Sequence, residues 1–131
     1  MTCFWDGILT AIDDNLFQKV LGKPKCMVKC FITELKMHNK QTQNVLWNGS
    51  PLINQQLEEN FQAVNEFNIN GIYGGYDCST FDPFLFLVSE IFNVDIIHNF
   101  NGAIINYNNI NNIHGKISFA SDRGHFWFCN R

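Results

Sequence analysis

The dipeptide Asn101-Gly102 separates two apolar segments and constrains the fold of this chain more than any other local feature. Asn-Gly is the preferred sequence of the two-residue type I′ turn, which joins antiparallel strands. We therefore predict a β-hairpin from the flanking segments, VDIIHNF and AIINY. Farther along the chain, KISFAS and HFWFC flank Asp122-Arg123-Gly124, and this arrangement predicts a second hairpin.

The first half of the sequence carries helical patterns instead. Apolar residues recur every four positions from Phe4 to Val20, which predicts one long amphipathic helix that ends at Gly22-Lys23-Pro24. Residues 38–49 are polar and are predicted to form a loop, and Ser50-Pro51 is typical of the start of a second helix. After Asp82-Pro83, a third helix is apolar nearly all round and should be buried. Helices first and strands last favour an α+β fold with helices packed on a small antiparallel sheet.

Length and composition restrict the class of protein. The chain has 131 residues and is 46% hydrophobic, which fits a single domain with a substantial core. The net charge is −3 and no Lys/Arg run interleaves with the aromatic residues, so we expect no nucleic-acid partner. No apolar run is long enough for a membrane span, and no secretory signal is visible. The sequence therefore predicts an intracellular protein without a membrane partner.

The five cysteines bear on redox state and on metal binding. In an intracellular protein they are expected to be free thiols. Cys26 and Cys30 are four positions apart in CMVKC and could share one helix face. A structural zinc site needs four ligands, and no second Cys or His pair with suitable spacing is present. We therefore predict no metal and no organic cofactor.

One pair of residues has the chemistry of a catalytic site. Cys3 lies where the first helix begins, and His125 lies where the last strand begins. A helix N-terminus stabilises a thiolate, and a nearby imidazolium lowers the pKa of a thiol further. From the residues alone, two other interpretations stay open, a buried structural Cys3 and a core His125. His98 alternates with Ile96 and Phe100 and is predicted to pack in the core.

Three segments resemble, in the same order, the ovarian-tumour-type (OTU) family of cysteine proteases. CFWDGILTAI resembles the family's nucleophile helix, in which apolar or aromatic residues follow the cysteine. IYGGYDCSTFDPFLFLVSEIFNVDIIHNF resembles its central block of an aromatic residue, two glycines, a buried helix and a strand. ISFASDRGHFWFC resembles its closing hairpin, in which the catalytic histidine precedes an aromatic residue.

The resemblance implies one OTU-like domain over residues 1–131 with a papain-like fold. It implies a cysteine-type deubiquitinase that hydrolyses (iso)peptide linkages of ubiquitin or a ubiquitin-like protein without a cofactor. Cys3 would be the nucleophile, and His125 the general base that activates the thiol and then protonates the leaving amine. Gly74-Gly75 and Tyr73 match a region near the family's substrate channel.

The chain departs from the family pattern on both sides of the dyad. The family usually has Asp-Gly-Asn before the cysteine, whereas only Met1 and Thr2 precede Cys3 here. Trp127 stands where the family has an orienting Asp or Asn, so Asp122 and Asn130 are the candidates for that role. The alternative hypothesis is therefore a catalytically inactive OTU-like module with a binding or virion structural role. The family also occurs in many viruses, which would place the protein in the host cytoplasm or in the virion.

Overall fold

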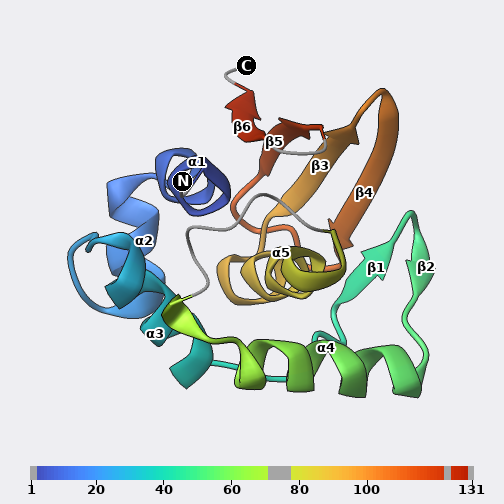
Figure 1. Ribbon diagram of the computed structural model, residues 1–131, viewed down its shortest axis with the longest axis horizontal. Coiled ribbons are helices and arrows are strands. Elements are labelled where there is room, and N and C mark those ends of the chain that lie inside the picture. The colour runs from blue at the N-terminus through green and yellow to red at the C-terminus, as the bar shows by residue number, and fades with distance from the viewer. Residues whose placement is uncertain (1–2, 71–77, 123–124, 130–131) are drawn as a thin grey trace.

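The computed structural model describes the backbone of residues 3–70, 78–122 and 125–129, and the side chains of 4–70, 81–122 and 125–129 (Figure 1). The helices are α1 (Cys3–Ala11), α2 (Asp14–Leu21), α3 (Val28–Met37), α4 (Asn54–Glu66) and α5 (Cys78–Phe92). The strands are β1 (Val45–Trp47), β2 (Ser50–Pro51), β3 (Asp95–Phe100), β4 (Ala103–Asn109), β5 (Lys116–Ser121) and β6 (Phe126–Cys129). The predicted α+β class is confirmed.

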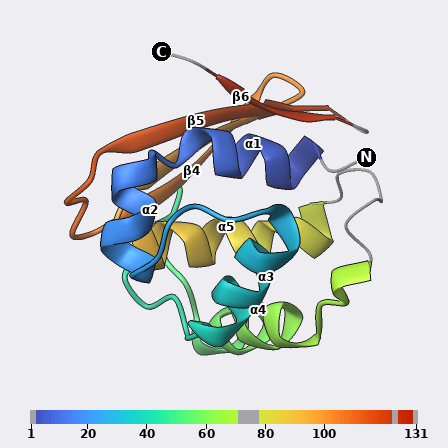
Figure 2. The same cartoon turned by 90° about the vertical axis from the view of Figure 1, so that its left-hand side faces the viewer.

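The six strands form one sheet in the order β2-β1-β4-β3-β5-β6. Helices lie on one face of this sheet, with α1 and α5 against it and α3 and α4 farther away (Figure 2). The prediction of a purely antiparallel sheet is wrong, because β3 and β5 pair in parallel, with Ile96 opposite Ile117. β4 occupies one edge of β3 as its hairpin partner, so β5 adds at the other edge after the chain has crossed over.

The turn between β3 and β4 has the predicted type I′ character. Asn101 has a φ of 52° and Gly102 a φ of 94°, so both central residues have positive φ. The Gly102 N–H also donates to Oδ1 of Asn99, at 2.8 Å. Ile96 lies opposite Tyr107 across the resulting antiparallel ladder. The Asn-Gly signal therefore identified the hairpin and its turn type.

Replacing Gly102 with alanine should lower the free energy of unfolding by about 1–2 kcal/mol, because a side chain is strained at positive φ. A Cβ at this position would meet nothing within 4 Å, so the cost comes from the backbone alone. Equilibrium urea unfolding measures it, with Asn101→Gly as the matched control that should change stability by no more than about 0.5 kcal/mol. Equal stability of Gly102→Ala and the wild type would contradict the turn assignment.

The predicted first helix is instead two helices, α1 and α2. Asp13 starts α2, because its carboxylate accepts the N–H groups of Asn15 at 2.7 Å and Leu16 at 3.3 Å. An aspartate that bonds forward in this way competes with continuation of the preceding helix. The predicted end is confirmed, since Gly22 caps α2 in a left-handed conformation with a φ of 74°.

Residues 38–51 also differ from the prediction. The expected loop contains β1, and Ser50-Pro51 is the edge strand β2 rather than a helix start, since α4 begins at Asn54. The turn between β1 and β2 is Asn48-Gly49, a second Asn-Gly pair in which both residues have positive φ. Proline is tolerated in β2 because an edge strand needs no ladder hydrogen bond on its outer side.

The central helix α5 is buried as predicted but begins earlier than predicted. Phe84, Leu85 and Val88 are fully buried, which confirms the all-round apolar pattern. The helix begins at Cys78, so Pro83 lies inside it and not at its first position. Glu90, also buried, accepts hydrogen bonds from the backbone N–H and the side-chain amide of Asn44, at 2.9 and 2.8 Å. These bonds tie the chain just before β1 to α5.

The cysteines do not all remain free thiols. Cys26 and Cys30 are joined in a disulfide, with their Cα atoms 5.9 Å apart. Cys26 precedes α3 and Cys30 lies in its first turn, so the four-residue spacing places the two Cα atoms within the usual range for a disulfide. The expectation of free thiols is therefore wrong for this pair, whereas Cys129 is free and half-buried.

Candidate functional site

The structure places the backbone of Cys3 at the first residue of α1. Its side chain lies outside the described residues, as do Gly74-Gly75, Tyr73 and Asn130. The first N–H groups of a helix have no partner within that helix, and together with the helix dipole they favour a negative charge. The start of α1 at Cys3 therefore favours a negative charge, and the thiolate at Cys3 stays a prediction.

His125 lies between β5 and β6, immediately before the first residue of β6, and it is exposed to solvent. Its backbone N–H donates to Oδ1 of Asp122 at 3.0 Å, and the N–H of Asp122 donates to the carbonyl oxygen of His125, also at 3.0 Å. These two bonds tie the backbone of His125 to Asp122, the residue that follows β5. The alternative of a core histidine at this position is therefore wrong.

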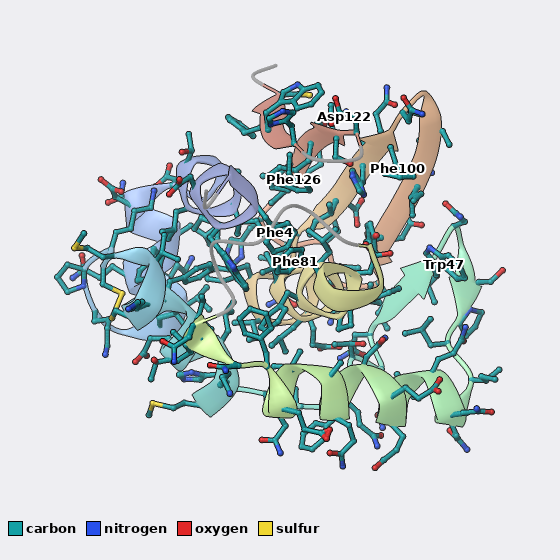
Figure 3. All side chains as sticks on the ribbon, in the orientation of Figure 1. Phe4, Trp47, Phe81, Phe100, Asp122 and Phe126 are labelled. Carbon is teal, nitrogen blue, oxygen red and sulfur yellow. A yellow bond between two sulfur atoms is a disulfide. The ribbon has the colours of Figure 1, made fainter. Side chains whose placement is uncertain are left out.

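Phe4 and Phe126 bring the two predicted catalytic segments together. Phe4 follows Cys3 and Phe126 follows His125, and the two ring centroids are 4.7 Å apart. Phe81 of α5 stacks on the other side of Phe4 with a centroid distance of 4.5 Å, and Figure 3 shows the three side chains converging. The start of α1 is thereby held against the start of β6 through the residues that follow Cys3 and His125.

Gly7 permits the close approach of α1 to β6. A Cβ on Gly7 would lie 3.2 Å from Cδ1 of Phe126 and 3.7 Å from the backbone nitrogen of Phe128, so a side chain here would require the Phe126 ring to shift by a few tenths of an ångström. An open hollow of about 410 Å³ lies along this contact, between Asp6 and Thr10 on α1 and the strand residues Phe126 to Phe128. An open groove thus runs beside the strand that follows His125.

Asp122 and Trp127 bear on the third catalytic group. Asp122, one of the two predicted orienting residues, uses Oδ1 to accept the backbone N–H of His125 and so contributes to the turn. Trp127, two positions after the histidine, has 48% of its surface exposed and lies opposite Ala120 in the β5–β6 ladder. The orienting role of Asp122 toward the imidazole stays a prediction.

His98 packs in the core, as predicted. It is fully buried, and its Nε2 lies 2.6 Å from Oγ of Ser121, which sequence reasoning did not identify as a partner. Loss of solvation lowers the pKa of His98 from 6.5 to about 4, so the ring is neutral at physiological pH. The ring of Phe126 packs near it, with centroids 5.4 Å apart. His98 therefore supports the residue that follows His125.

The contacts among Phe4, Phe81 and Phe126 were not predicted from the sequence. A signal was present, because an aromatic residue directly follows both the predicted nucleophile and the predicted base.

Within the part of the chain that the structure describes, no group of three His, Cys, Asp or Glu side chains could hold a metal ion. Among the same residues, no helix has the length and apolar character needed to cross a membrane.

Comparison of the chain with protein-family models, with curated proteins and with solved structures finds no match. The class that the structure defines is an α+β protein with a mixed six-stranded sheet covered by helices on one face.

Proposed function

We propose that this protein is an OTU-type cysteine protease that hydrolyses (iso)peptide linkages of ubiquitin or a ubiquitin-like protein through Cys3 and His125. The observation that carries the proposal is the contact of Phe81 and Phe126 with Phe4, at ring distances of 4.5 and 4.7 Å. Each of these rings comes from one of the three segments that resemble the family, so segments distant in sequence meet where the dyad would form. The exposure of His125 also supports the proposal, because a general base must reach the substrate.

The chemistry follows from the two positions. His125 takes the proton of the Cys3 thiol, and the thiolate attacks the carbonyl carbon of the scissile bond. The backbone N–H of Cys3, at the start of α1, would donate to the developing oxyanion. The imidazolium returns its proton to the leaving amine as the carbon–nitrogen bond breaks, which leaves a thioester on Cys3. Water then attacks the thioester with His125 as base, and the carboxylic acid product and the free thiol are released.

A ubiquitin probe with a thiol-reactive warhead at its C-terminus tests this proposal. The wild type should form a covalent adduct visible by mass spectrometry, whereas Cys3→Ala should form none, since it lacks the nucleophile. The reaction of His125→Ala should be slower than that of the wild type by a factor of about 10³ or more, because the thiol loses its base. Cys129→Ala removes the free thiol on β6 and is the matched control that should retain the wild-type rate.

The result that would contradict the proposal is a folded wild type that forms no adduct, or an adduct that persists in Cys3→Ala. A second candidate function is an inactive OTU-like module that binds ubiquitin or a related protein. The exposed Trp127, where the family has an orienting Asp or Asn, favours this alternative. Non-covalent binding of ubiquitin without adduct formation would establish the inactive module instead.

A further inference from the structure

A second hollow, also of about 410 Å³, lies between the β1–β2 hairpin, α4 and α5. Its apolar part is formed by Trp47 on β1, Leu52 after β2, and Pro83 and Phe86 on α5. Figure 3 shows Trp47 on β1, well separated from Phe4 and Phe126. This hollow is therefore distinct from the groove between α1 and β6.

The walls of this hollow belong to the folded framework. Phe86 is buried and packs edge-on against Tyr107 of β4, with ring centroids 4.8 Å apart. Trp47 lies opposite Tyr107 in the β1–β4 ladder, so one strand residue braces both aromatic walls. The hydrogen bonds that Asn44 donates to Glu90 hold the chain before β1 against α5. The hollow is consequently preformed and needs no folding step to accept a ligand.

Its chemistry selects a positively charged group with an apolar stem. Trp47 has 42% of its surface exposed, although it lines a concave site. Two carboxylate residues, Glu59 on α4 and Asp82 on α5, line the same hollow, and no Lys, Arg or His is among its described lining residues. An exposed indole face attracts organic cations, and Arg does so most often because its planar guanidinium stacks on the ring. The carboxylates complement the same charge.

We propose that this hollow binds an arginine side chain of a polypeptide partner. The guanidinium stacks on Trp47 and pairs with Glu59, while the aliphatic stem covers Leu52 and Phe86. This site does not require Cys3 or His125 to be catalytic, so it stands independently of the proposed function.

A titration of ¹⁵N-labelled protein with the capped peptide acetyl-Gly-Arg-Gly-amide tests the proposal. The indole N–H signal of Trp47, assigned with Trp47→Phe, should shift saturably with a Kd of roughly 1 mM. Acetyl-Gly-citrulline-Gly-amide has nearly the same shape without the charge and should bind at least about tenfold more weakly. Glu59→Gln should weaken arginine binding about three- to fivefold. Glu66→Gln, which changes an exposed carboxylate of α4 outside the hollow, should have no effect.

Three outcomes would overturn the proposal. The first is the absence of a saturable shift at Trp47 in a protein whose spectrum is that of the folded state. The second is equal binding of the arginine and citrulline peptides, which would remove the role of charge. The third is a shift that follows Trp127 instead of Trp47, which would place binding on β6. Cys3→Ala should bind the arginine peptide as the wild type does. The peptide titration therefore tests the arginine site, and the warhead experiment tests the proposed protease activity.

Discussion

Replacement of Phe126 by alanine should lower the free energy of unfolding by about 3–5 kcal/mol, the range for loss of a buried aromatic ring. Phe126 is only 2% exposed. Its ring contacts Phe4 of α1 at 4.7 Å and Phe119 of β5 at 4.8 Å, and it also lies against His98. Truncation would leave a cavity between the first helix and the last strand. Equilibrium unfolding in guanidinium chloride, followed by circular dichroism, measures the change.

Trp127→Ala is the matched control for this prediction. Trp127 is the next residue of the same strand, but 48% of its surface is exposed, so its loss should cost no more than about 1 kcal/mol. Comparable destabilisation by the two variants would contradict the described packing of α1 on β6. The warhead probe adds a functional readout, because a folded Phe126→Leu variant should react more slowly when the support of His125 is loosened.

Acidification from pH 6.5 to pH 4 should remove about 3 kcal/mol of stability through His98 alone. Burial lowers the pKa of this residue to about 4 in the folded protein, against 6.5 in the unfolded chain. Between these values the unfolded chain binds a proton that the folded protein does not bind. The free energy of unfolding therefore falls as the pH falls, and the contribution is fully present only above the unfolded pKa.

His98→Gln isolates this contribution from the carboxylates that also titrate in acid. Glutamine keeps a polar group that can reach Ser121, which lies 2.6 Å from the histidine Nε2, but it does not titrate. The rings near His98 belong to Phe100 and Phe126, which carry no charge. Urea unfolding at intervals from pH 4 to pH 7 should show a shallower decline for the variant. If the free energies of unfolding of the two proteins fall in parallel with pH, His98 does not cause the loss of stability in acid.

Local signals predicted the elements of this fold better than their arrangement. The Asn101-Gly102 turn, the Gly22 helix end and the buried α5 are as predicted, because each depends on residues that are adjacent in sequence. The break at Asp13 was missed because the apolar repeat continues through it, and only the carboxylate's bonds to Asn15 and Leu16 identify a new helix start. The parallel pairing of β3 with β5 depends on which edge of β3 is free. The hydrophobic periodicity of the sequence does not indicate which edge this is.

In the candidate site, too, the residue types were predictable from the sequence, whereas their exposure and contacts were not. The types and positions of Cys3 and His125 were sufficient to propose a dyad. The exposure of His125 could not be predicted, because both faces of the HFWFC segment are rich in apolar residues and the turn bonds to Asp122 are not visible in a pattern. The contact of Phe4 with Phe81 and Phe126 joins three distant segments, so it required the tertiary structure.

The contact between Phe4 and Phe126 also sets a time order for the protein during its synthesis. The ribosome makes about 5–20 residues per second, so α1 waits several seconds for the strand that covers it. During that interval Phe4 lacks the ring of Phe126, and the segment that carries His125 has not yet been made. The proposed nucleophile is therefore separated from its base on every nascent chain that has not yet been extended through β6.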